Sequence, residues 1–146
     1  MIFFILSLSS CGRELSTIDS LEVYKTRELG FSQAVIFNEV VYGSGQVGWD
    51  KEYQLPEEQS FANQFDKTLQ NIALILQDQG CDWQDVLHLR FYVVNIDISK
   101  TRDIGNFLKA TYPKHYAPAT TLLGVSALAR ENLLIEIEFT AKIKKK

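Results

Sequence analysis

The sequence of 146 residues predicts one α+β domain, a two-layer sandwich in which two helices cover one face of a mixed β-sheet. Strand-like runs with alternating apolar residues, and two longer segments with apolar residues three and four positions apart, carry this prediction. The segments follow one another in the order β-β-α-β-α-β-β. Because a strand–helix–strand step favours parallel strands joined by a right-handed crossover, both helices are expected on the same face of the sheet.

The first two strands are expected to form a hairpin. Asn38 and Glu39 separate two β-branched and aromatic runs at 35–37 and 40–42, which is the spacing of a two-residue turn. The second run leads into the sequence Gly-Ser-Gly at 43–45. Glycines within a strand predict a bulge or a close approach of the backbone to another group.

The first helix is predicted over residues 56–80. Pro56 suits its first turn, and Glu57 and Glu58 suit the positive end of the helix dipole. Gly80 suits a left-handed cap at the C-terminal end. One stripe of this helix is apolar and is expected to face the core: Phe61, Phe65, Leu69, Ile72 and Leu76.

A strand with alternating side chains is predicted at 86–94. Four of its apolar residues are expected to face the helices: Leu87, Leu89, Phe91 and Val93. The second helix is predicted over about 100–112, with Asp97 or Ser99 as its N-terminal cap and Pro113 as its stop. Its inner face is expected to consist of Ile104, Phe107, Leu108 and Tyr112.

The last two strands are predicted to start after Pro118 and to span 133–143. The face of the sheet without helices then carries polar and charged residues: Arg90, Tyr92, Glu136, Glu138 and Thr140. Such a face is either solvated surface or a subunit interface in which the charges find partners. The interface is favoured, because a small domain that leaves one sheet face uncovered often forms oligomers.

The charge balance argues against nucleic acid as a partner. The formal net charge is −3, and the only basic run is the three C-terminal lysines, which is typical of a solvated tail. The two histidines, His88 and His115, and the two cysteines, Cys11 and Cys81, do not have the spacing of metal ligands. Neither a metal nor another cofactor is therefore expected.

Residues 1–20 are interpreted as an apolar segment and tail that precede a single domain at 21–146. The sequence Leu-Ser-Ser-Cys that ends at Cys11 resembles the lipobox of bacterial lipoproteins, although the apolar run is short and no Lys or Arg precedes it. One alternative is an envelope lipoprotein attached to the membrane through an acylated Cys11. The working prediction is a cytoplasmic protein whose first residues form a strand or tail.

Five segments occur in the order and spacing of a known family. They are VVYGSGQVGW at 40–49, the helix ending at Gly80, DVLHLRFYVV at 85–94, YAPATTLLGVSAL at 116–128 and LIEIEFTA at 134–141. On these segments the chain resembles the RidA family, also called YjgF or endoribonuclease L-PSP. The resemblance implies a chorismate-mutase-like fold and a homotrimer with three ligand clefts between subunits. It also implies hydrolysis of enamines and imines, such as 2-aminoacrylate, to a keto acid and ammonia.

The resemblance further implies which residues form the site. Glu136 occupies the position of a glutamate that positions water or moves protons. Ser44 and Gly45 match a Ser-Gly-Gln segment whose backbone groups line the pocket. Phe31 stands where the family has a tyrosine, so a hydroxyl is lost at this position.

One part of the implied site departs from the family. The family's Pro-Ala-Arg motif reads Pro-Ala-Thr here, so Ala119 is followed by Thr120 in place of an arginine that would hold a substrate carboxylate through two hydrogen bonds. This loss is expected to weaken capture of an anionic substrate by roughly one to two orders of magnitude. Thr120 and Thr121 are either a neutral hydrogen-bonding pocket or β-forming residues at a strand start. Arg90 is either a relocated clamp or part of a structural ion pair.

Three functions are compatible with these residues. The favoured one is a homotrimer that binds a small metabolite in clefts between subunits and hydrolyses an imine or enamine, but 2-aminoacrylate inefficiently. The second is a non-catalytic member that binds a ligand or a partner protein, for which the missing arginine is the main argument. The third is RNA cleavage, against which the acidic charge balance argues. His88 is a further candidate base, with a surface or packing role as the alternative.

Overall fold

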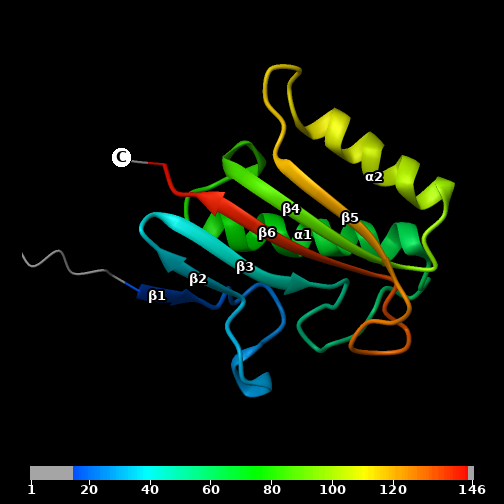
Figure 1. The fold of residues 1–146 in the computed structure, drawn as a ribbon. Coiled ribbons are helices and arrows are strands. Elements are labelled where there is room, and N and C mark those ends of the chain that lie inside the picture. Colours follow the sequence, from blue (N-terminus) through cyan, green and yellow to red (C-terminus); the bar gives the residue numbers. More distant parts are fainter. Residues whose placement is uncertain (1–14, 145–146) are drawn as a thin grey trace, which may run out of the picture.

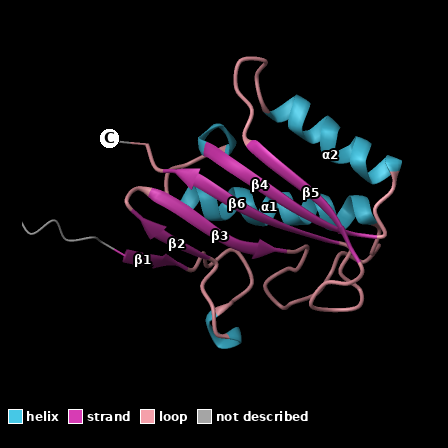
Figure 2. Ribbon diagram, in the orientation of Figure 1, coloured by secondary structure: helices cyan, strands magenta, loops and turns pink. Residues whose placement is uncertain are grey.

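The computed structural model describes residues 15–144, and over this range six strands form one mixed sheet in the order β1-β2-β3-β6-β4-β5. The strands are β1 (Leu15–Ile18), β2 (Ala34–Phe37), β3 (Val40–Gln46), β4 (Val86–Val94), β5 (Ala119–Val125) and β6 (Ile135–Lys142), and the helices are α1 (Phe61–Asp78) and α2 (Ile98–Thr111). Figure 1 shows α1 crossing behind the sheet and α2 running beside β5. The two-layer α+β sandwich predicted from the sequence is confirmed (Figure 2).

The predicted hairpin and bulge are both present. Strands β2 and β3 pair antiparallel, and Asn38 and Glu39 connect them with φ angles of 50° and 63°. Two left-handed residues in a two-residue turn match the right-handed twist of the strands. The pairing of β3 with β6 shifts register between Gly43 and Gln46, which is the bulge.

Strand β1 was not predicted. It pairs antiparallel with β2, from Leu15 opposite Phe37 to Ile18 opposite Ala34. Only Ile18 is buried and Leu15 is 68% exposed, so the segment has no alternating apolar pattern that would mark a strand. The observed order is therefore β-β-β-α-β-α-β-β, and the first strand lies within the part of the chain that was assigned to the N-terminal tail.

The lipobox-like sequence and Cys11 lie outside the described residues, so the alternatives for the N-terminus and for the location in the cell stay predictions. Among residues 15–144, no helix has the length and apolar character that crossing a membrane requires.

The start of the first helix differs from the prediction. Helix α1 begins at Phe61, and Pro56, Glu57 and Glu58 lie in the loop before it. Ser60 is the N-terminal cap, and its side chain accepts a hydrogen bond from a backbone N–H of the first turn. A serine hydroxyl satisfies one of the free N–H groups at a helix start, which Pro and Glu do not do as directly.

The other predicted helix ends agree with the structure. Gly80 adopts the left-handed conformation with φ +65°, and its N–H donates to the carbonyl of Gln77 at 2.9 Å. Asp97 caps α2 by accepting a hydrogen bond from the backbone N–H of Lys100 at 2.9 Å. The helix ends before Pro113, as expected.

One core residue of β4 was predicted wrongly. Leu87 is 41% exposed, whereas Val86 and Leu89 are fully buried. The pairing of β4 with β6 shifts register between Val86 and His88, so alternation restarts after this irregularity. From Leu89 onward, apolar residues face the helices as predicted.

Both helices pack against the same face of the sheet. Phe65 of α1 makes edge-to-face contacts with Phe91 of β4 and Phe107 of α2, at centroid distances of 6.5 and 5.8 Å. Strand β6 lies at the centre of the sheet, and its inward residues are almost fully buried: Ile135, Ile137, Phe139 and Ala141. Their neighbours Glu136 and Glu138 therefore lie on the face that the helices leave open.

The sheet order decides which functional segments can meet. Strands β4 and β5 are parallel neighbours joined through α2, as predicted. Strands β3 and β4, joined through α1, are not neighbours, because β6 inserts between them and pairs antiparallel with both. Two strands, β6 and β4, therefore separate β3 from β5.

Candidate functional site

Glu136 lies on the open face of β6, and its carboxyl group rests on the backbone of β3. A Cβ added to Gly45 would lie 1.8 Å from Oε1 of Glu136, so only glycine leaves room for the carboxyl at this position. Glu136 is half-buried, and burial together with the nearby charge of Glu138 raises its pKa. A carboxyl that keeps its proton to higher pH is suited to acid–base chemistry.

Ser44 ties β3 to the segment that contains Phe31. Its hydroxyl donates to the carbonyl of Ser32 at 2.7 Å, and its N–H donates to the carbonyl of Gln33 at 2.9 Å. The aromatic side chain of Phe31 is 43% exposed. The structure thus brings four of the predicted site residues to one region: Phe31, Ser44, Gly45 and Glu136.

The remaining predicted residues of the cleft lie on β5. Thr121 is in register with Arg90, and its hydroxyl lies 3.4 Å from Nε2 of His88 on the open face. Thr120 is in register with Leu89 and donates to the carbonyl of Pro118 at 3.2 Å. Because neighbouring residues of a strand point to opposite faces, Thr120 and Thr121 do not form a paired pocket within one chain.

Arg90 forms an ion pair. Its Nη1 lies 3.5 Å from Oε2 of Glu138, its partner across β4 and β6, while Glu136 lies opposite Tyr92. The pair is partly exposed and long, so its contribution to stability is small. The same cluster raises the pKa of Tyr92, through burial and then through Glu138.

Within one chain, the predicted site consists of two separate halves. Phe31, Ser44, Gly45 and Glu136 lie around β3 and β6, whereas residues 119–121 lie across the sheet on β5. A cleft that contains both halves requires a second copy of the chain. Across residues 15–144, no group of three or more His, Cys, Asp or Glu side chains could hold a metal ion.

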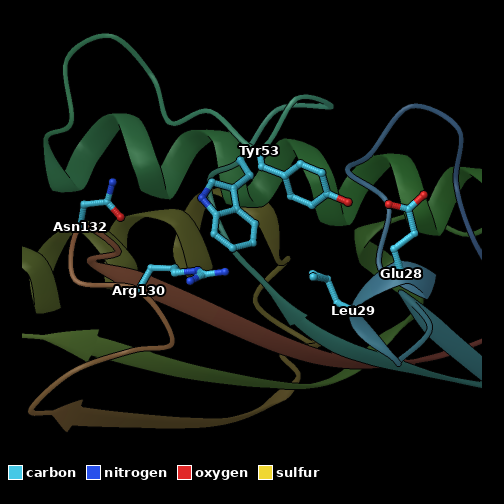
Figure 3. A pocket seen from close by; sticks show the side chains of 6 residues that line it. Glu28, Leu29, Tyr53, Arg130 and Asn132 are labelled. Atoms are coloured by element: carbon cyan, nitrogen blue, oxygen red, sulfur yellow. The ribbon is translucent and has the colours of Figure 1, made fainter.

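The structure also contains a cavity that the sequence analysis missed, which we call the loop pocket (Figure 3). It has a volume of about 580 Å³ and is lined by Glu28, Leu29, Trp49, Tyr53, Arg130 and Asn132. These residues come from three segments that are far apart in the sequence, so no local sequence pattern indicated that they would form a pocket. The only signal was Trp49 at the end of the segment VVYGSGQVGW.

Tyr24 lies between the loop pocket and Glu136. Its ring contacts Trp49 edge-to-face at 5.3 Å, and its hydroxyl accepts a hydrogen bond from the N–H of Val47 at 3.2 Å. Burial raises the pKa of Tyr24, and the charge of Glu136 raises it further. Tyr24 therefore contacts the wall of the loop pocket at Trp49 and is close enough to Glu136 to sense its charge.

The six-stranded mixed sheet with two helices on one face and a half-buried acid on the other defines a class of two-layer α+β proteins. The chain belongs to the RidA family, because the family model for endoribonuclease L-PSP matches residues 25–143. It is 30% identical over 111 residues to a human protein named 2-iminobutanoate/2-iminopropanoate deaminase, covering 76% of this chain and 78% of the relative.

Solved structures agree with this assignment. RidA from the Antarctic bacterium Psychrobacter superposes with a TM-score of 0.74 at 29% identity, covering 88% of this chain and 99% of that chain. YyfA from Yersinia pestis, a member of the conserved Rid protein family, has a TM-score of 0.78 at 24% identity, covering 89% and 100% of the two chains. The second likeness concerns the fold alone.

Proposed function

We propose that the protein is a homotrimer that binds a small metabolite in clefts between subunits and hydrolyses an imine or enamine there. The carboxyl of Glu136 on Gly45, half-buried with a raised pKa, is the observation that carries this proposal. The human relative whose name denotes an imine deaminase supports it. In each cleft, Phe31, Ser44 and Gly45 of one subunit face residues 119–121 of its neighbour.

The chemistry follows from one proton-carrying group. Protonated Glu136 gives its proton to the substrate, at the methylene carbon of an enamine or the nitrogen of an imine. Water adds to the resulting iminium carbon, and the carboxylate takes a proton from that water. Glu136 then gives this proton to the amino nitrogen of the adduct, and the carbon–nitrogen bond breaks as the hydroxyl becomes the carbonyl and returns its proton to the carboxylate. The products are a keto acid and ammonia, and Glu136 is protonated again.

The substrate differs from an ordinary α-imino acid in how it is held. Thr120 presents a hydroxyl where the family's motif has a guanidinium, and Arg90 is paired with Glu138. A neutral hydroxyl contributes less than a charge-assisted contact to binding of a carboxylate. Hydrolysis of 2-aminoacrylate is therefore expected to be slow, and an imine other than 2-aminoacrylate is the better substrate.

Release of keto acid from enamines and imines generated in situ tests the proposal. The wild-type protein should exceed the background rate, and Glu136→Gln should lower the rate by about two to four orders of magnitude. Thr120→Arg should raise turnover of 2-aminoacrylate by roughly one to two orders of magnitude. Equal rates for the wild-type protein and Glu136→Gln would remove Glu136 from the mechanism.

The alternative is a non-catalytic member that binds a ligand or a partner, and the absence of a guanidinium at Thr120 favours it. It predicts no keto-acid release with any imine, while ligand binding persists in Glu136→Gln. RNA cleavage is the third candidate, and the net charge of −3 argues against it. If ribonuclease activity disappears from the preparation on further purification, RNA cleavage is excluded as the function of this protein.

A further inference from the structure

We propose that the loop pocket is a second ligand site, which takes a small planar carboxylate with a cationic or hydrogen-bond-donating group at its far end. Arg130 holds the carboxylate, and Glu28 holds the distal group. This site lies within a single chain and needs neither the trimer nor imine hydrolysis.

The two charges of the loop pocket are available to a ligand. Neither Arg130 nor Glu28 forms a side-chain hydrogen bond or ion pair with another residue in the described range 15–144, whereas Arg27 and Arg90 are paired with Asp19 and Glu138. Figure 3 shows Arg130 and Glu28 on opposite sides of the cavity, with Tyr53 and Leu29 between them. A planar guanidinium matches a carboxylate through two parallel hydrogen bonds.

Two buried amides of α1 hold the walls of the loop pocket in place. Gln64 is fully buried; its side chain donates to the carbonyl of Asn132 at 2.8 Å and accepts from the N–H of Leu134 at 2.9 Å. Asn71, also fully buried, donates to the carbonyls of Val47 and Trp49 at 2.9 and 2.8 Å. Both walls are thus fixed to one helix, which reduces the cost of ordering them when a ligand binds.

The segment that contains Glu28 forms the third wall of the loop pocket, and a strained tyrosine, Tyr53, holds it in place. Tyr53 has φ +60°, an uncommon conformation for a residue with a side chain, and its hydroxyl donates to the carbonyl of Lys25 at 2.6 Å. This bond ties the turn at Tyr53 to the segment that contains Glu28. Strained residues of this kind gather at ligand clamps and similar functional positions.

An aromatic surface explains the preference for a planar ligand. Trp49 contacts Tyr53 at a centroid distance of 5.8 Å, and Tyr24 contacts Tyr53 at 6.1 Å. A volume of about 580 Å³ lies within the usual range for small-molecule sites, roughly 300–1,000 Å³. The combination of one arginine, one glutamate and this surface selects a dipolar planar molecule.

Calorimetric titration of the full chain with three probes tests this site: 4-(aminomethyl)benzoate, benzoate and benzamide. Affinity should decrease in that order. Arg130→Gln should weaken binding of benzoate about tenfold and leave benzamide unchanged. Glu28→Gln should weaken only the aminomethyl probe. Arg102→Gln, which changes an exposed arginine of α2, is the matched control and should have no effect.

The indole N–H resonances of Trp49 and Trp83, assigned with Trp→Phe variants, locate the bound probe. The proposal expects Trp49 to shift and Trp83 to stay. Equal affinity for benzoate and benzamide, an unchanged affinity in Arg130→Gln, or no binding of any probe would overturn it. Binding that persists in Glu136→Gln supports it and separates it from the proposed hydrolysis.

Discussion

The open face around Glu136 and the loop pocket are neighbouring regions whose functional side chains differ. Glu136 is a half-buried acid, and the one arginine on its sheet face that was a candidate clamp, Arg90, is paired with Glu138. The loop pocket has an aromatic surface and an arginine, Arg130, whose side chain has no partner among residues 15–144. In the two proposals, proton transfer and carboxylate binding are thus separated, and a ligand engages them at different places.

The two regions also differ in how they are completed. One chain supplies the walls of the loop pocket; buried amides of α1 fix two of them, and the Tyr53 hydroxyl holds the third. Each chain supplies only one half of the proposed cleft at Glu136, because two strands separate β3 from β5. Variants of the first region should therefore act within a chain, and variants of the second should depend on assembly.

The largest effect on stability is expected from Gly43→Ala. A Cβ at Gly43 would lie 2.1 Å from the ring of Phe139, which is buried in the core and cannot move aside. Overpacking of this kind costs about 1–3 kcal/mol, which thermal or denaturant unfolding would detect.

Gly45→Ala is the matched variant two residues along the strand. The Cβ meets the end of the Glu136 side chain, which is free to rotate away. Stability should change by less than in Gly43→Ala, while keto-acid release should fall because the carboxyl is displaced. Equal destabilisation by both alanines, with activity retained in Gly45→Ala, would contradict the placement of Glu136.

A loss of stability of the same order is expected when the anchor of the loop pocket is removed. Gln64→Leu leaves the carbonyl of Asn132 and the N–H of Leu134 without their partner. An unsatisfied buried group costs about 1–3 kcal/mol, and the loop with Arg130 loses its position. Unfolding should show the loss, and binding of benzoate should weaken while the oligomeric state is unchanged.

The smallest effect is the pH dependence that comes from Glu136. Because the folded pKa is raised above the unfolded value, the native state binds more protons in the window between the two pKa values. The wild-type protein should therefore lose stability relative to Glu136→Gln as pH rises from below the unfolded pKa to above the folded one. Glu57→Gln, in the exposed loop before α1, is the control and should show no such trend.

The sequence predicted the regular part of the structure well. The hairpin at Asn38 and Glu39, the Asp97 cap and the open-face position of Glu136 follow from short patterns that local geometry dictates. Glu136, Ser44 and Gly45 were found through a family resemblance, and the structure brings them together.

The rest could not be predicted, for physical reasons. Strand β1 has too little buried surface to show alternation, and the register shift after Val86 is invisible in the sequence, so Leu87 was assigned to the core. Arg130, Trp49 and Glu28 line one cavity because Gln64 and Asn71 of α1 hold two of the loops and the Tyr53 hydroxyl holds the third segment. Such long-range contacts leave no periodic signal in a single sequence.

Subunit mixing tests the central claim most directly. Glu136→Gln removes the acid, and Thr120→Glu places a negative charge on β5, so each variant alone should be inactive. If a cleft takes Glu136 from one subunit and β5 from its neighbour, trimers assembled from equal amounts of both variants should recover roughly a quarter of the wild-type keto-acid release, since a quarter of the clefts contain two intact halves. No recovery in verified mixed trimers, or a protein that is monomeric in native mass spectrometry, would contradict the account.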